Sequence, residues 1–119
     1  MIEITTQSVI EGLTAIVDEF GEDYVYPEKE AVIPRCLYVH DGEPDCIVGK
    51  FLHSVGIPLE RLKKADEVDG GTPAWKLLGQ LEDERVLTAE DRGLNILQRA
   101  QDHQDSGIAW GEALRRAMQ

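Results

Sequence analysis

The amino-acid sequence predicts a mainly α-helical, compact single domain, residues 1–119, with about five helices and room for a minor two-stranded β ribbon. Three observations support this prediction: an apolar stripe at helical spacing near the N-terminus, several proline-marked helix starts in the middle, and one helical phase through the end of the chain. Burial of about two-thirds of the unfolded surface is typical of this length. The 42% hydrophobic content is therefore enough for a core.

The first helix is expected from Thr6 to Phe20. Thr5 or Thr6 can cap its first turn, and Gly21 stands where helices commonly end in a left-handed residue. The apolar side chains recur three and four residues apart and so share one face. They are Val9, Ile10, Leu13, Ile16, Val17 and Phe20.

Two short segments rich in aromatic and β-branched residues follow, Tyr24–Tyr26 and Cys36–Val39. Such segments favour extended structure, and pairing them would form the minor ribbon. Pro27 ends the first segment. The sequence His40-Asp-Gly-Glu43 then predicts a tight turn, because Asp-Gly accepts positive φ angles.

Pro44 suits the first position of a second helix, which we expect to run to about Val55 and to stop at Gly56. A third, short helix is expected from Pro58 to about Ala65. The two glycines that end the segment 67–71 make it the best candidate for a flexible connection.

Thr72-Pro73 combines a capping residue with a proline and predicts another helix start. Trp75, Leu78 and Leu81 then repeat at helical spacing. We expect both Trp75 and Trp110 to anchor the core rather than to form a stacking platform for nucleic-acid bases, because the chain is acidic.

The segment from Thr88 to Met118 keeps one helical phase and crosses Gly107 without a slip. One long helix and two helices broken at Gly107 both fit this pattern, and the continuous helix is slightly favoured. Gly107 and Gly111 would each cost about 1 kcal/mol relative to alanine inside a helix. Close approach of another backbone would explain such glycines.

The net charge of −11 is distributed unevenly. Residues 1–45 hold 11 acidic and 2 basic side chains, whereas residues 46–119 hold 12 acidic and 10 basic ones. Direct binding of nucleic acid needs clustered Lys and Arg and is not expected. No apolar run approaches the ~18 residues of a membrane helix, and no signal peptide opens the sequence. We expect no membrane association and a cytoplasmic location with reduced cysteines.

Both cysteines and two of the three histidines fall between Cys36 and His53. Cys36, His40, Cys46 and His53 suit zinc by residue type, but their gaps of four, six and seven residues lack the tight pairs of structural sites. Cys46 near a helix start could be a nucleophile, yet His53 would lie about 10 Å further along the helix. We therefore expect packing cysteines, no metal, no cofactor and no enzymatic activity.

Several short patterns resemble small uncharacterised proteins of actinobacteria and their bacteriophages. The patterns are Tyr24-x-Tyr26, Cys36-x-Tyr-Val39, Gly42-x-Pro-x-Cys46-x-Val-Gly49 and the tail Ala100-Gln-x-x-Gln-Asp105-x-Gly107-x-x-Trp110-x-x-Ala-Leu114. The resemblance implies a cytoplasmic accessory protein and transfers no site residues.

The sequence thus predicts a small acidic, non-enzymatic protein that binds a protein partner. The partner would meet the acidic first 45 residues or the glycine-bearing last helix. Within the former, the turn residues His40, Asp41, Glu43 and Asp45 are the candidate contact, because turns on rigid scaffolds often carry recognition. The alternatives are an acidic nucleic-acid mimic that inhibits a DNA-binding protein and a small Cys/His metalloprotein. Homodimerisation through the last helix is also compatible with the pattern.

Overall fold

The computed structural model describes residues 1–27 and 37–119. This part of the chain is mainly α-helical with minor β structure, as the sequence predicts. Its elements, in chain order, are β1 (Ile2–Ile4), α1 (Thr6–Phe20), β2 (Val39–His40), β3 (Glu43–Pro44), α2 (Ile47–Ser54), α3 (Leu59–Asp66), α4 (Ala74–Asp83), β4 (Leu87–Ala89), α5 (Asp91–Asp105) and α6 (Trp110–Ala117).

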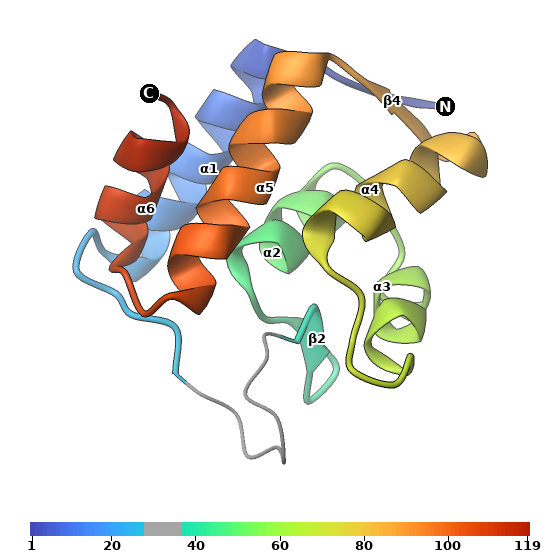
Figure 1. Cartoon of the computed structure of the whole chain (residues 1–119), viewed down its shortest axis with the longest axis horizontal. Coiled ribbons are helices and arrows are strands. Elements are labelled where there is room, and N and C mark those ends of the chain that lie inside the picture. The colour runs from blue at the N-terminus through green and yellow to red at the C-terminus, as the bar shows by residue number, and fades with distance from the viewer. Residues whose placement is uncertain (28–36) are drawn as a thin grey trace.

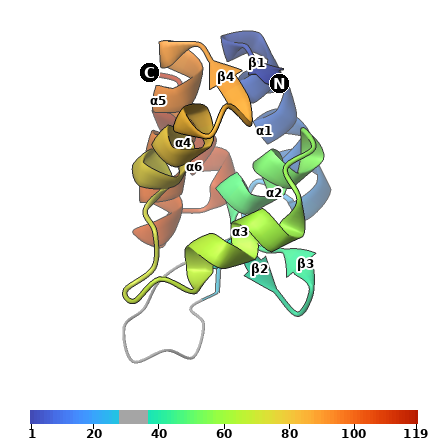
Figure 2. The same cartoon turned by 90° about the vertical axis from the view of Figure 1, so that its right-hand side faces the viewer.

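Helix α5 is the centre of the arrangement. It packs against α1, α2, α4 and α6, and α1 and α6 flank it on one side while α4 lies on the other (Figure 1). The two pairs of strands lie at opposite ends of the molecule, β1 with β4 at one end and β2 with β3 at the other (Figure 2). The β2–β3 end contacts α2 and α3.

Helix α1 has the bounds that the apolar stripe predicts. Thr5 is the cap: its hydroxyl accepts a hydrogen bond from the Ser8 amide at 3.0 Å, and the Ser8 hydroxyl accepts one from the Thr5 amide at 2.9 Å. This reciprocal pair satisfies two amides at the helix start. Gly21 ends the helix with a φ of 100°.

The minor β ribbon is confirmed, but other residues form it. Val39–His40 pairs with Glu43–Pro44 in an antiparallel hairpin. Asp41 and Gly42 have φ angles of 51° and 77°, which suit the tight turn that joins two such strands. Tyr24–Tyr26 forms no strand, and Cys36 lies outside the described residues. A two-residue turn closes a local pair at less entropic cost than a longer loop.

A second strand pair was not predicted. Strands β1 and β4 run parallel, with Ile2 opposite Leu87 and Ile4 opposite Ala89. Within this pair, the side chains of Ile4 and Leu87 are buried. The two strands are far apart in the sequence and each has only three residues. Segments this short show no periodic pattern from which the pair could be predicted.

The expectation of one continuous last helix is wrong. The chain breaks between α5 and α6, and Gly107 takes a φ of 83°. After the break, the Trp110 and Gly111 amides donate to the carbonyl oxygens of Tyr24 and Glu22, at 2.8 and 2.9 Å. The break therefore gives the first amides of α6 partners that a continuous helix would not reach.

The expected close approach of another backbone is wrong for Gly107, where an added Cβ atom would meet none of the described residues within 4 Å, and is confirmed for Gly111. A Cβ atom at this position would lie 2.9 Å from the carbonyl oxygen of Glu22. The approaching backbone belongs to the same chain.

Other helix starts differ by a few residues from the prediction. Helix α2 begins at Ile47 with Cys46 as its cap, because Pro44 is taken up in β3. In α3 and α4, Pro58 and Pro73 stand one position before the first helical residue rather than in it.

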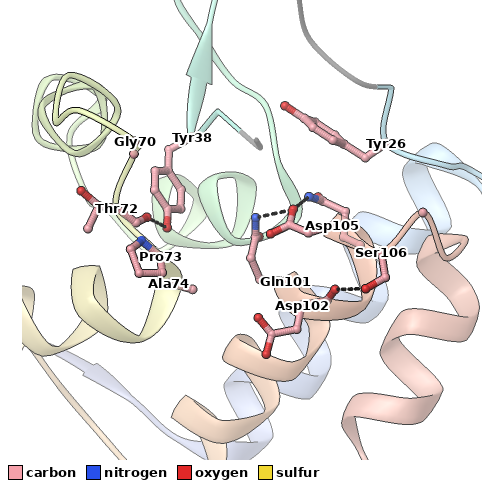
Figure 3. A pocket seen from close by; sticks show the side chains of 13 residues that line it. Tyr26, Tyr38, Gly70, Thr72, Pro73, Ala74, Gln101, Asp102, Asp105 and Ser106 are labelled. Carbon is pink, nitrogen blue, oxygen red and sulfur yellow. Dashed lines mark hydrogen bonds between the residues drawn. The ribbon is translucent and has the colours of Figure 1, made fainter. Parts of the chain in front are cut away.

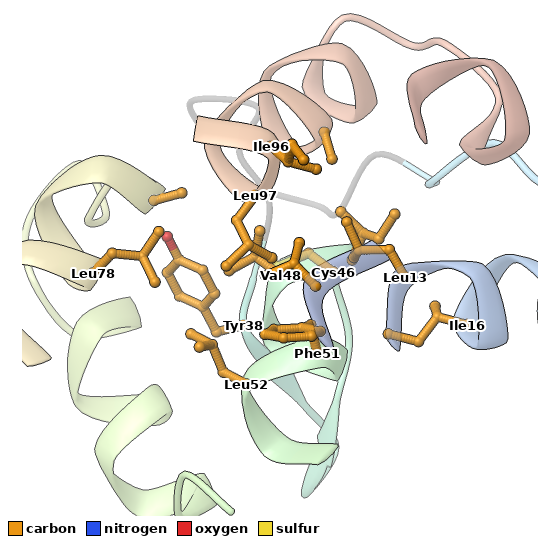
Figure 4. Close-up of a cluster of buried hydrophobic side chains, with 14 of the residues drawn as sticks. Leu13, Ile16, Tyr38, Cys46, Val48, Phe51, Leu52, Leu78, Ile96 and Leu97 are labelled. Carbon is orange, nitrogen blue, oxygen red and sulfur yellow. The ribbon is translucent and has the colours of Figure 1, made fainter. Parts of the chain in front are cut away.

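The core lies where α1, α2, α4 and α5 meet (Figure 4). Leu13, Val48, Phe51 and Leu97 are each 0% exposed. Cys46 and Trp110 are also buried, as expected, but the prediction for Trp75 is wrong, since it is 63% exposed. Among the described residues, none of the helices has the length and apolar character that crossing a bilayer requires.

Candidate functional site

The predicted contact residues lie in and beside the β2–β3 hairpin, at one end of the molecule (Figure 2). His40, Asp41 and Glu43 are exposed, and the Asp41 side chain keeps 89% of its accessible surface. The His40 Nε2 atom lies 3.4 Å from an Asp41 carboxylate oxygen. The hairpin thus presents one imidazole and two carboxylates to solvent.

The base of the hairpin is held firmly to the helices. The Asp66 carboxylate at the end of α3 accepts hydrogen bonds from the Tyr38 amide at 2.9 Å and the Val39 amide at 3.0 Å. Gly49 of α2 lies against the other side, where an added Cβ atom would come within 2.5 Å of the Tyr38 carbonyl oxygen. The turn therefore stands on a base that is fixed from two helices.

Asp45 differs from the other three predicted residues. It is half-buried, and its carboxylate accepts a hydrogen bond from the buried Tyr26 hydroxyl. Burial, reinforced by this hydrogen bond, holds the pKa of Tyr26 far above its ordinary value. The same hydroxyl accepts a hydrogen bond from the Leu37 amide at 3.2 Å. Asp45 thus fastens the hairpin to the segment after α1.

A pocket of about 530 Å³ lies beside the hairpin base (Figure 3). Its walls come from the C-terminal end of α5, from the loop before α4 and from two tyrosines. The described lining residues are Tyr26, Tyr38, Gly70, Gly71, Thr72, Pro73, Ala74, Gln101, Asp102, Gln104, Asp105, Ser106 and Gly107.

Two buried glutamines of α5 organise one wall of this pocket. Gln104 and Gln101 accept hydrogen bonds from the Ile47 and Val48 amides, at 2.9 and 3.3 Å, and so cap the start of α2. Their side-chain amides donate to one oxygen of Asp105, at 2.9 and 3.4 Å. The glutamines connect the helix start to a carboxylate at the pocket.

The Asp105 carboxyl titrates unusually late for an aspartate. Partial burial raises its pKa to about 6, and the neighbouring Asp102 carboxylate acts in the same direction. The hydrogen bond from Gln104 favours the charged form and limits the rise. The surroundings of Asp105 disfavour its ionised form, and a bound cation would stabilise that form.

The four cysteine and histidine residues considered for zinc are placed as follows. Cys46 is 0% exposed, and its sulfur accepts the Gly49 amide at 3.4 Å, so it packs and caps. His40 and His53 are exposed, on the hairpin and on α2. Cys36 lies outside the described residues. Within residues 1–27 and 37–119, no three side chains of His, Cys, Asp or Glu gather into a possible metal site.

Several pocket residues, among them Gln101, Gln104 and Asp105, appear in the sequence patterns above, but none of those patterns marks a binding site. Leu97, Gln101 and Gln104 are spaced by four and three residues, so the two glutamines continue the buried face of α5. A polar amide on an apolar face is a signal of a buried hydrogen-bond network. Tyr38 and Thr72 carry no such signal, because their contact, a hydroxyl-to-carbonyl bond of 2.6 Å, joins distant segments.

Comparisons of this chain with protein-family models, with curated proteins and with solved structures find no match.

Proposed function

We propose that this chain is a small, cytoplasmic, non-enzymatic accessory protein that binds a protein partner through the β2–β3 hairpin. The observation that carries the proposal is the anchoring of an exposed, charged turn by the Asp66 carboxylate and the Gly49 backbone contact. A turn held in one conformation loses little entropy on binding, which favours recognition. Asp45 contributes as a support of the turn.

A partner with a basic surface fits this hairpin best. Asp41 and Glu43 extend from it, and the whole chain carries a net charge of −11. Complementary charge accelerates encounter and selects the orientation of the complex. Binding should therefore weaken as the salt concentration rises.

Affinity capture from the native cell tests this proposal with two matched double variants. Asp41→Asn with Glu43→Gln removes two charges from the hairpin, and asparagine tolerates the positive φ of position 41. Glu3→Gln with Asp83→Asn removes two exposed charges elsewhere, on β1 and α4. The same partner should be recovered with the wild type and the α4/β1 variant, and about tenfold less with the hairpin variant.

Equal recovery of that partner by the hairpin variant would contradict the proposal. The isolated complex should then be measured by calorimetry at several salt concentrations, with the same three proteins. An unchanged affinity of the hairpin variant in this second assay would also count against the hairpin.

A nucleic-acid mimic remains a second candidate, because another set of exposed acids gathers around the end of α1. These are Asp18, Glu19, Glu22 and Asp23. Under this proposal the captured partner would be a DNA-binding protein, duplex DNA would compete with the chain for it, and neutralising Asp18 and Glu19 would weaken binding more than changing the hairpin.

A further inference from the structure

The pocket beside the hairpin base is large enough to hold a small organic ligand. Its volume of about 530 Å³ lies within the range of small-molecule sites. Two tyrosines stand on its walls, and α5 supplies the charged groups of the described lining (Figure 3). This site is separate from the exposed turn, and the inference does not depend on the function proposed for the hairpin.

Among the described lining residues, the charged groups at the pocket are all of one sign. Asp102 and Asp105 lie one turn apart on α5, and none of the described lining residues is Lys, Arg or His. The local electrostatics therefore favour a positively charged ligand.

The Asp105 carboxylate is held in place by the fold. Its Oδ1 atom accepts hydrogen bonds from Gln104 and Gln101, both 2% exposed, which are themselves fixed by the first amides of α2. Its Oδ2 atom accepts no hydrogen bond from the residues that the structure describes. One oxygen is thus positioned by buried groups while the other can serve a ligand.

The tyrosines offer no free hydroxyl to a ligand, and Tyr26 alone keeps some accessible aromatic surface. The Tyr26 hydroxyl bonds to Asp45, and the Tyr38 hydroxyl donates to the Thr72 carbonyl oxygen at 2.6 Å. With both hydroxyls engaged and Tyr38 only 1% exposed, the accessible part of the Tyr26 ring, which is 8% exposed, is the aromatic surface open to a ligand. Aromatic rings attract organic cations and also cover their apolar stems.

We propose that this pocket binds an organic cation, an ammonium or guanidinium group on an apolar stem. The charged group pairs with Asp105, Asp102 adds negative potential from one turn away, and the stem packs against the accessible part of Tyr26. The cation is either a free small molecule or a Lys or Arg side chain of a peptide. Both sources share the same chemistry, and the experiment separates them.

The titration of Asp105 agrees with this geometry. Burial raises its pKa to about 6. The ionised carboxyl is therefore disfavoured by its surroundings, as expected where no described cation pairs with it. A bound cation pairs with the carboxylate and should lower this pKa.

Nuclear magnetic resonance of the full chain tests the proposal. The probes are n-butylguanidinium and n-butylammonium, with N-butylurea as a neutral analogue of the first, and the side-chain amide signals of Gln101 and Gln104 report binding. Saturable shifts are expected with the two cations and not with the urea. Asp105→Asn should weaken cation binding by about tenfold, because a charge-assisted pair is lost. Asparagine still offers an oxygen to both glutamine amides, so the pocket is expected to keep its form.

Two further variants serve as charge controls for Asp105→Asn. Asp102→Asn removes an exposed charge and should weaken binding by only about two- to threefold. Asp83→Asn on α4 removes an equal charge outside the pocket and should leave the affinity unchanged. Capped tripeptides with a central Arg, Lys or norleucine distinguish the sources: tighter binding of the Arg or Lys peptide than of the free cation assigns the site to a side chain, and weaker binding assigns it to a free molecule.

The proposal is overturned if the two cations give no saturable shift, or if N-butylurea binds as tightly as n-butylguanidinium. It is also overturned if Asp105→Asn retains its fold and the full affinity for the cations.

Discussion

Trp110 lies in a cluster of three aromatic rings, whereas Trp75 projects from the surface of α4. The Trp110 ring centroid is 4.6 Å from that of Tyr24 and 5.4 Å from that of Phe20. Trp110 is 0% exposed and Trp75 is 63% exposed. The same residue type therefore has two roles: one ring joins α1, the following turn and α6, and the other contributes little to the core.

The two tryptophans should differ greatly in their contribution to stability. Trp110→Ala leaves a large cavity and is expected to lower the free energy of unfolding by about 3–5 kcal/mol. Trp75→Ala should change it by less than about 0.5 kcal/mol, as for other exposed positions. Urea unfolding followed by circular dichroism measures both, and each variant is the control for the other. Similar losses for the two variants would contradict the burial of Trp110 or the exposure of Trp75.

At the scale of the element, the start of α2 shows how distant residues complete a helix. Its first three amides are bonded by Gln104 and Gln101 of α5 and by the sulfur of Cys46. Helix starts carry amides without partners inside the helix, and burying them unpaired costs free energy. The contact between α2 and α5 is thus polar as well as apolar, which fixes the position of the helix along its neighbour. Gly49 adds a second constraint, since it admits the Tyr38 backbone.

Two helical glycines should respond to alanine in opposite directions. In Gly49→Ala the new methyl group would meet the Tyr38 carbonyl oxygen at 2.5 Å, so a loss of about 1–3 kcal/mol in unfolding free energy is expected. In Gly79→Ala the methyl group meets nothing within 4 Å, and the better helix former should add about 0.5–1 kcal/mol. Thermal and urea unfolding of both variants measure the difference, and a stabilised Gly49→Ala would refute the close contact.

At the scale of the whole molecule, the Asp105 carboxyl makes stability depend on pH, because its surroundings raise its pKa to about 6. A raised carboxyl pKa makes the folded chain hold its proton longer than the unfolded chain. Between about pH 4, where the unfolded carboxyl ionises, and about pH 6, where the folded one does, stability therefore falls as pH rises. Below this window the group is protonated in both states and has no such effect.

Asp105→Asn removes this pH-dependent loss. The difference in unfolding free energy between the variant and the wild type should shift in favour of the variant by about 1 kcal/mol between pH 4 and pH 7, a figure reduced for partial solvent access. Urea unfolding at four pH values measures it. Asp83→Asn, which removes an equal charge from the surface, is the control for net charge. A difference that stays constant across this range would contradict the raised pKa.

The sequence by itself determined the features that depend on neighbours in the chain. The apolar stripe and Thr5 set α1, and the Asp41-Gly42 pair set the hairpin turn. The predicted contact residues His40, Asp41 and Glu43 were placed on an exposed turn for the same local reason. These features arise from side-chain periodicity, capping and φ preferences, which act over a few residues.

Only the tertiary structure decided the rest. The parallel β1–β4 pair, the break at Gly107 and the glutamine caps of α2 all depend on hydrogen bonds between residues distant in the sequence. Periodicity in the sequence shows which residues share a helix face but not whether that face meets another element. For this reason Trp75 was predicted to be buried although it is exposed. The pocket formed for the same reason: its described walls come from four parts of the chain, and its chemistry exists only once they meet.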